Sequence, residues 1–277
     1  MQSRAATRSR RRLLVIGGAE RHAPAGAAIL GRFVELAGGP DARIVVIATA
    51  SEEPDVLEAE YADAFERLGA KQVEALRLTG RGQANGNAAL EVLDDATAVY
   101  FTGGDQRRIA AIIGGTRSDQ LLQARVEAGE IILGGTSAGA AMMAGTMIVG
   151  GDQPGVSAAS VETGPGLEFL PGVLVDMHFG ERGRLNRLLS AVALYPHELA
   201  LGIDEGTAIL VEGDRFEVIG DGSVTVIDAG LADRISAPAH GPFALTDARI
   251  HVLPAGCTFD LTGRSPSTPD AAAGNGE

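Results

Sequence analysis

A glycine-flanked serine that directly follows an apolar run limits what this chain can fold into more than any other feature. Residues 131–134 read Ile-Ile-Leu-Gly, and Gly135-Thr136-Ser137-Ala138-Gly139 comes next. The pattern G-x-S-x-G is typical of a nucleophile elbow, a sharp turn from a strand into a helix. Glycines are needed there because chain segments approach too closely for a Cβ atom. The stretch predicts an exposed Ser137 hydroxyl and an Ala138 amide free to stabilise an oxyanion; a glycine-rich loop with an incidental serine is the alternative.

Apolar runs alternate with segments of helical spacing through the first half of the chain. The runs expected to be buried strands are 13–16, 44–47, 73–78, 98–101 and the stretch before Ser137. The segments expected to be helices are 24–37, 54–68, a short one around Leu90, 106–113 and 121–128. This rhythm predicts an α/β sandwich with a mainly parallel sheet. The composition agrees, because 45% of the residues are hydrophobic but only 4% are aromatic, which suits an aliphatic parallel sheet.

Glycines and polar side chains gather where these strands are expected to end. They are Gly17-Gly18, Thr49-Ala50-Ser51, Thr102-Gly103-Gly104-Asp105-Gln106 and Ser137. Ligands of parallel α/β sheets bind beyond the carboxyl ends of the strands, so this convergence favours a nucleophilic role for Ser137. Gly17-Gly18 does not extend into G-x-G-x-x-G, and the first strand therefore carries no dinucleotide-binding fingerprint.

The second half of the chain is expected to be richer in strands. Residues 174–179 read as a strand and 200–208 as a strand and turn, on either side of a helix over 181–194. Short strands at hairpin spacing follow at 209–211, 215–219, 224–227 and 250–253. We expect one catalytic domain over residues 13–263 with a β-rich C-terminal part. It is expected to lie between a disordered basic tail at 1–12 and a disordered Pro/Ser/Ala/Gly tail at 264–277.

Charge and cysteine content exclude several classes of function. The formal net charge of −13 disfavours nucleic-acid binding but leaves a cationic substrate open. Cys257 is the only cysteine, which excludes an intrachain disulfide and a cysteine-based metal site. Residues 9–14, Ser-Arg-Arg-Arg-Leu-Leu, superficially resemble a twin-arginine export signal, but the apolar run is short and meets Glu20 and Arg21. We therefore expect a basic tail that leads into the first strand, and hence a cytoplasmic protein. No membrane partner is expected, because no apolar stretch is long enough to span a bilayer.

A serine nucleophile needs a base that takes its proton. Among the histidines, His178 is the best candidate, because it ends an apolar strand and is flanked by Asp176, Glu181 and Arg182. The other histidines lie in loops, at a helix end or in the late strands, without such a polar cluster: His22, His197, His240 and His251. A structural histidine at a strand end is the alternative reading, and the presence of the elbow favours the base.

The base in turn needs a carboxylate that orients it. Glu205 is favoured because it lies at a strand end, after Gly202-Ile203-Asp204. Asp204 and Asp176 remain alternatives for this role. The resulting order Ser…His…Glu differs from the Ser…Asp/Glu…His order of α/β-hydrolases, so that fold is not expected.

Five blocks of residues together resemble the cyanophycinase family, serine peptidases that also include the aspartyl dipeptidase called peptidase E. The blocks are 14–20, 101–106, 134–140, 176–189 and 202–208, and the resemblance runs from about Leu13 to Val226 in matching order. The elbow is shared across the family, whereas the pattern H-F-x-x-R-G-R-L-x-R-L-L from His178 onward points to cyanophycinases. The resemblance implies a three-layer fold of the class I glutamine amidotransferase-like, flavodoxin-like type.

The resemblance further implies an exopeptidase that releases β-aspartyl-arginine dipeptides from cyanophycin, a poly-aspartate backbone with arginine on each β-carboxyl. Ser137 would be the nucleophile, His178 the base and Glu205 the orienting acid. We expect the Ala138 amide and a glycine amide of Gly103-Gly104 to hold the oxyanion. The residues that would line the substrate pocket are Gln106, Asp176, Arg182, Arg184 and Arg187. Arginine forks suit substrate carboxylates. The chemistry needs no metal or organic cofactor, and relatives of this type are commonly homodimers.

The chain departs from the family pattern at two places. The family usually has Gln at the position of Met177, also expected at the substrate, and a thioether cannot replace the hydrogen-bonding groups of an amide. The first-strand loop reads Glu20-Arg21-His22, where the family tends to carry an acidic and then a basic residue. The alternatives are therefore an isoaspartyl or aspartyl dipeptidase of the same family and an inactive relative that acts as a binding module. Glutamine amidotransferase chemistry is disfavoured, because it requires a cysteine on the elbow and Cys257 lies far along the chain.

Overall fold

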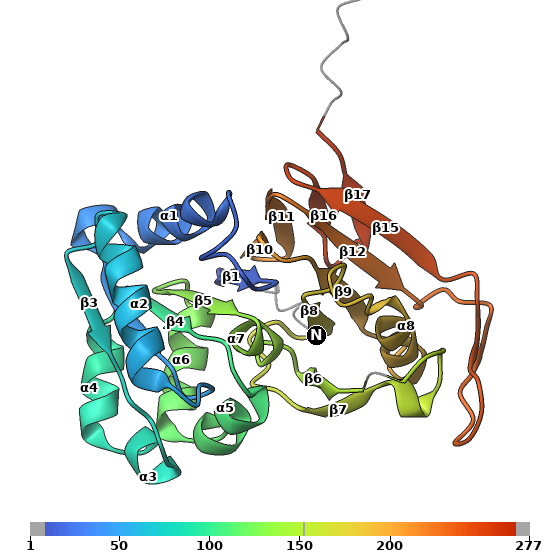
Figure 1. The fold of residues 1–277 in the computed structure, drawn as a ribbon, viewed down its shortest axis with the longest axis horizontal. Helices are drawn as coiled ribbons and strands as arrows, with labels where there is room; N and C mark the ends of the chain where they lie inside the picture. Colours follow the sequence, from blue (N-terminus) through green and yellow to red (C-terminus); the bar gives the residue numbers. More distant parts are fainter. Residues whose placement is uncertain (1–8, 152, 270–277) are drawn as a thin grey trace, which may run out of the picture.

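The structure, a computed structural model, describes residues 9–151 and 153–269. Its largest element is a nine-stranded sheet with the order β17-β16-β11-β10-β1-β5-β4-β2-β3 (Figure 1). The parallel strands are β1 (Arg12–Ile16), β2 (Arg43–Ile47), β3 (Gln72–Ala75), β4 (Ala98–Phe101) and β5 (Ile132–Thr136). The antiparallel strands continue the sheet beyond β1: β10 (Thr207–Glu212), β11 (Arg215–Gly220), β16 (Thr258–Asp260) and β17 (Ser265–Ser267).

Helices cover both faces of the parallel half, because its strands are apolar on both faces. One face carries Leu14 and Ile16 and packs against Phe33 of α1. The helices on that face are α1 (Gly26–Ala37) and α2 (Pro54–Arg67). The opposite face carries Leu13 and Val15. The helices on this second face are α3 (Arg81–Ala84), α4 (Asn87–Asp95), α5 (Gln106–Ile113) and α6 (Arg117–Glu127), as Figure 1 shows.

A second sheet of four strands covers the antiparallel half, on the face opposite to α1. Its order is β15-β12-β9-β8. The strands are β8 (Val173–Met177), β9 (Leu199–Ile203), β12 (Ser223–Asp228) and β15 (Arg249–Pro254). Alternate residues of β8 face opposite sides: Val173 and Val175 pack toward the main sheet, whereas Leu174 packs against α8 (Leu185–Leu194). On this side the molecule therefore has a sheet and then a helix outside the main sheet.

Short elements connect these layers. Two small hairpins are formed by β6 (Thr146–Gly150) with β7 (Glu162–Pro165) and by β13 (Arg234–Ser236) with β14 (Ala244–Thr246). The remaining elements are the helix α7 (Ala138–Ala141) and the 3-10 turns η1 (Gly39–Asp41) and η2 (Ala158–Ser160). Among the helices of the described residues, none combines the length and apolar character that a bilayer crossing requires.

The predicted α/β class and the expected parallel strands are confirmed, and the C-terminal part is rich in strands as expected. The second sheet is a difference from the expectation of three layers. Segments 173–177 and 199–203 are buried on both faces, and such strands look alike in sequence whichever sheet they join. The helix expected over 181–194 begins only at Leu185, because residues 181–184 form turns.

Both expected tails overlap regular structure at their inner ends. Arg12 begins β1, and Ser265–Ser267 form β17. Arg264 donates hydrogen bonds to Asp228 Oδ1 (2.5 Å) and to the His197 carbonyl (2.5 Å), which holds the start of the second tail against the second sheet. Residues 1–8 and 270–277, the outer parts of the expected tails, lie outside the described residues.

Phe33→Ala tests the packing between α1 and the sheet. Phe33 is fully buried and contacts Tyr100 with ring centroids 5.5 Å apart. We expect the substitution to lower the free energy of unfolding by about 3–5 kcal/mol, measured by urea titration, because it leaves a cavity. Val56→Ala on α2 is the control: Val56 is 49% exposed, and its free energy of unfolding should change by less than about 0.5 kcal/mol. Equal effects of the two substitutions would contradict this packing.

Candidate active site

Ser137 lies at a sharp turn between β5 and α7. Its φ of 51° is in the left-handed region, which residues with a Cβ atom adopt rarely. A Cβ on Gly135 would come within 2.3 Å of the Gly139 carbonyl oxygen, and one on Gly139 within 2.3 Å of the Phe101 carbonyl oxygen. The turn therefore requires glycine on both sides of the serine.

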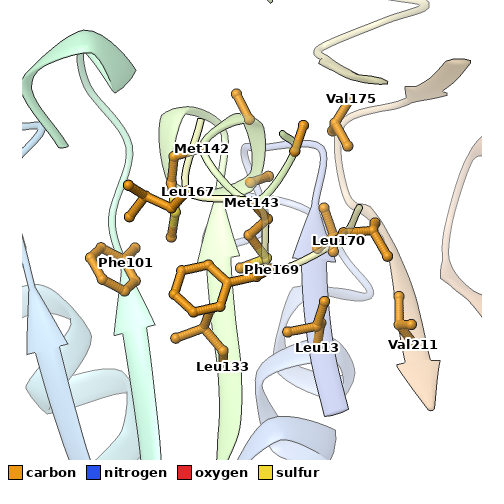
Figure 2. Close-up of a cluster of buried hydrophobic side chains, with 14 of the residues drawn as sticks. Leu13, Phe101, Leu133, Met142, Met143, Leu167, Phe169, Leu170, Val175 and Val211 are labelled. Atoms are coloured by element: carbon orange, nitrogen blue, oxygen red, sulfur yellow. The ribbon is translucent and has the colours of Figure 1, made fainter. Parts of the chain in front are cut away.

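The segment after this turn is anchored in the core beneath the site. Met142 and Met143 are fully buried and lie in one cluster with Phe101 of β4 and with Phe169 and Leu170 of a later loop (Figure 2). The Leu170 amide also donates to the Met143 carbonyl, at 2.7 Å. This packing limits how far the turn can move.

The end of β1 and the loop after it contact every segment that carries a candidate catalytic residue. The Ser137 amide donates to the carbonyl of Ile16 (3.1 Å) and the His178 amide to that of Gly17 (2.9 Å). The amide of Gly206, next to Glu205, donates to the Gly18 carbonyl at 2.9 Å. Segments distant in sequence therefore meet at the carboxyl ends of β1, β5, β8 and β9.

Ser137, His178 and Glu205 form a continuous chain of hydrogen bonds. Ser137 Oγ lies 2.9 Å from His178 Nε2, and His178 Nδ1 lies 2.5 Å from Glu205 Oε1. The His178 side chain is 13% exposed and that of Glu205 35% exposed. With the proton on Nδ1 directed at the carboxylate, Nε2 is free to accept the serine proton. The arrangement can generate a serine nucleophile.

Gly18 lies directly beneath the imidazole ring of His178. A Cβ on Gly18 would lie 2.3 Å from Cε1, 2.7 Å from Nε2 and 2.9 Å from Nδ1 of that ring, and the φ of Gly18 is +118°. His178 itself has a φ of 48°. The ring position therefore depends on both a bare glycine and an unusual backbone conformation.

The alternative carboxylates are engaged elsewhere. Asp204 accepts hydrogen bonds from the Gly180 amide (2.9 Å) and from the amide and hydroxyl of Ser223 (3.0 and 2.8 Å). Glu181 accepts a hydrogen bond from the Glu205 amide at 3.2 Å. This contact was not predicted from the sequence. The only sequence signal for it is an acid three residues after the histidine. The structure therefore brings Glu205, and not Asp204, to His178.

The turn after β4 lies beside the serine. A Cβ on Gly103 would lie 3.5 Å from the Ser137 Cβ, so the turn after β4 adjoins the elbow. Among the described residues, the amides of Gly103, Gly104 and Ala138 donate to no backbone carbonyl. They are therefore available to a substrate oxygen. Gln106, just beyond this turn, is partly buried and donates from Nε2 to the Ile148 carbonyl at 2.8 Å.

Two of the expected substrate-binding arginines instead form an internal cluster with Asp176. Asp176 is fully buried, its Oδ2 accepts from Arg187 Nε at 2.8 Å, and its Oδ1 also bonds to Arg187 Nη2. Arg184 Nη1 lies 3.4 Å from Asp176 Oδ1 and 2.5 Å from the Met177 carbonyl. Burial lowers the pKa of Arg184 to about 10 while Asp176 acts against that shift, so Arg184 stays protonated at neutral pH. Arg182, by contrast, is exposed.

Met177 does not lie where the sequence analysis expected it, at the substrate. Side chains alternate along β8, so Asp176 faces α8 while Met177 faces the core between the two sheets. Met177 is 5% exposed and belongs to the same apolar cluster as Val175 and Ile203. A thioether suits such a core. The structure therefore places Met177 in packing contacts, and Asp176 with its arginines, rather than in an open pocket.

The other histidines of interest lie away from the elbow. His197 precedes β9 at its opposite end, with Nε2 3.6 Å from Glu198 Oε1. His251 on β15 lies against Phe259, with ring centroids 5.9 Å apart. Among the described histidines, His178 is the one hydrogen-bonded to Ser137.

Comparison with known proteins identifies a peptidase family. The model described as Peptidase family S51 matches residues 13–219. The cyanophycinase of Geminocystis herdmanii is 39% identical over 259 residues, which cover 92% of this chain and 95% of that relative. The cyanophycinase of a Nostoc species is 39% identical over 260 residues, which cover 91% of this chain and 86% of that relative.

Solved structures share the fold. A crystal structure of a peptidase from an acI-B1 Actinobacterium aligns with a TM-score of 0.69 and 24% identity, covering 91% of this chain and 98% of that chain. A putative peptidase E protein from Listeria monocytogenes aligns with a TM-score of 0.55 and 19% identity. The alignment covers 76% of this chain and 99% of that chain. The fold class expected from the sequence is thereby confirmed.

Gly18→Ala tests the contact between the first loop and the imidazole. The added methyl group would overlap the His178 ring, and we expect it to slow the reaction of Ser137 with a fluorophosphonate by at least about a hundredfold. Gly82→Ala is the control, because a Cβ there meets no atom within 4 Å. The rates are compared by mass spectrometry of the labelled protein. An unchanged rate in Gly18→Ala would show that the ring does not rest on this glycine.

Proposed function

This chain belongs to peptidase family S51, and we propose that it is a serine exopeptidase that cleaves cyanophycin into β-aspartyl-arginine dipeptides. The observation that carries the chemistry is the hydrogen-bonded chain from Ser137 through His178 to Glu205, at 2.9 and 2.5 Å. The substrate is supported by the 39% identity to cyanophycinases over nearly the whole chain.

We propose that the reaction proceeds through an acyl-enzyme. Ser137 Oγ attacks the carbonyl carbon of the scissile aspartate peptide bond while His178 Nε2 takes the serine proton. Glu205 holds the imidazole in the required tautomer and stabilises its charged form. The amide of Ala138 and one from Gly103-Gly104 donate to the developing oxyanion. His178 then protonates the leaving amine, and a water molecule, deprotonated by the same ring, releases the acyl group.

Arg182 is the best candidate to recognise a substrate carboxylate. It is exposed in the turn that follows His178, and its backbone amide donates to the His178 carbonyl at 3.1 Å. Arg184 and Arg187 act differently in this proposal, because both bond to the buried Asp176. Arg187 also bonds to the Gly151 carbonyl, and Arg184 Nη1 to the Met177 carbonyl. They hold the start of α8 against β8 and so support the position of the turn that carries Arg182. Gln106 supports the opposite side of the site through its bond to Ile148.

The arginine side chains of the proposed substrate call for negative charge near the site. A cavity of about 460 Å³ reaches Gly103 and Gly104 and includes Glu52, Asp105 and Arg108 in its wall. The net charge of −13 adds a general attraction for a cationic polymer. We further propose that the protein acts in the cytoplasm, since its single cysteine gives no intrachain disulfide, and as a homodimer like other members of its type.

Ser137→Ala is the first test of this function. Removing the hydroxyl should abolish the release of β-aspartyl-arginine from cyanophycin, measured by chromatography, and leave the melting temperature within about 2 °C of the parent. α-Aspartyl dipeptides and β-aspartyl-arginine serve as parallel substrates. If the protein hydrolyses only the dipeptides, it is a dipeptidase and not a cyanophycinase. Full activity of Ser137→Ala would contradict the role of Ser137 as nucleophile.

Arg182→Gln tests substrate recognition separately from chemistry. Loss of one exposed charge should raise KM for cyanophycin about three- to tenfold and leave kcat within about twofold of the parent. Arg215→Gln, which removes an exposed arginine from β11, is the matched control and should leave both constants near the parent values. A fall in kcat with an unchanged KM would contradict the assignment of Arg182 to binding.

A further inference from the structure

Glu20 is a buried carboxylate for which the proposed reaction has no chemical role. It lies in the loop between β1 and α1 and is 2% exposed. Its Oε2 accepts a hydrogen bond from the hydroxyl of Thr136 at 2.6 Å, and its Oε1 accepts from Tyr61 (2.5 Å) and Tyr100 (3.0 Å). The nearest arginine in sequence, Arg21, lies over the Tyr61 ring instead, 4.9 Å from its centroid. Hydroxyl groups, rather than a cation, therefore hold this carboxylate.

The three contacts suit a carboxylate that accepts all of its hydrogen bonds. Three hydroxyl groups surround it, and an ionised carboxylate accepts from all of them at once, whereas a protonated one must direct its own hydrogen at one of them. Burial, and then the negative charge of Glu20, raise the pKa values of Tyr61 and Tyr100 well above the usual value. Both tyrosines consequently keep their protons at neutral pH and donate to Glu20.

The position of Glu20 connects it to both reacting side chains. Thr136, which it holds, is the residue immediately before Ser137, and Gly18, two residues before Glu20, lies beneath the His178 ring. The bond from Thr136 to Glu20 therefore fixes the first loop to the end of β5 directly under the elbow. A shift of the loop would change the distance between Ser137 Oγ and His178 Nε2.

We propose that Glu20 is a positioning residue, which through Thr136 sets Ser137 and His178 at the distance that proton transfer requires. This rests on the proposed function, because Ser137 must be the nucleophile. A charged group is suited to the task, since hydrogen bonds to a carboxylate are shorter and stronger than neutral ones. Filling the same space with an apolar side chain would serve packing equally well, so packing alone does not require a carboxylate here.

The test compares Thr136→Val with Thr136→Ser and adds Glu20→Gln. Valine has nearly the shape of threonine but removes the bond to Glu20, whereas serine keeps the hydroxyl. The rate of Ser137 phosphonylation by a fluorophosphonate is measured, in which the Oγ–P bond forms, fluoride leaves and the serine proton passes to His178. We expect Thr136→Val and Glu20→Gln to lower this rate, and kcat on cyanophycin, about tenfold with KM within about twofold. Thr136→Ser should stay within about twofold of the parent.

Asp228→Asn is the matched control for losing a buried carboxylate. Asp228 is 3% exposed and bonded to Arg264 in the second sheet. Its substitution should lower the melting temperature and leave the phosphonylation rate unchanged. A parent-like rate in Thr136→Val, or an equal loss in Asp228→Asn, would overturn the proposal; if Glu20→Gln does not fold, the Thr136 pair still decides. A parent protein that is labelled at Ser137 but does not degrade cyanophycin refutes the substrate alone, and one not labelled at Ser137 refutes the proposed function.

Discussion

The loop of residues 17–20 holds the site together, because it contacts each strand end from which a candidate catalytic residue projects. Its carbonyls accept hydrogen bonds from the amides of His178 and Gly206, and the preceding carbonyl of Ile16 accepts from Ser137. The backbone of this loop also lies very close to the segment that carries Asp204. A Cβ on Gly17 would come within 2.1 Å of the Asp204 carbonyl oxygen, so two sheets can meet here only around a bare backbone.

This arrangement explains how strained conformations persist at the site. Ser137 and His178 both have positive φ angles, at 51° and 48°. Such residues cost roughly 1–3 kcal/mol each and are retained when the surroundings determine them fully. Here the amide of each is hydrogen-bonded to the first loop or the strand before it. In this conformation the serine hydroxyl and the imidazole lie within hydrogen-bond distance, at 2.9 Å.

Much of the parallel half could be predicted because its signals are local. Apolar runs and the glycines of the elbow determine short strands and one turn, and the strand ends of a parallel sheet share an edge. His178 and Glu205 could be predicted as the base and the orienting acid, because each is a polar residue at the end of an apolar strand. The sequence could not predict which side chains of those strands point to which face. β8 is buried on both sides, so the sequence does not show that Asp176 faces α8 and Met177 the core.

The role of Glu20 could not be predicted from the sequence, because its hydrogen-bond partners are distant in sequence and form no motif. These partners are Tyr61, Tyr100 and Thr136.

The proposed reaction requires a covalent bond between the substrate and Ser137 Oγ. The most direct measurement is to mix the protein with cyanophycin, quench in acid during turnover, and map the adduct by peptide mass spectrometry. We expect a cyanophycin-derived acyl adduct, joined through an aspartate carbonyl, on the peptide that contains Ser137. Turnover at full rate with that peptide unmodified, or with the adduct on another residue, would contradict it.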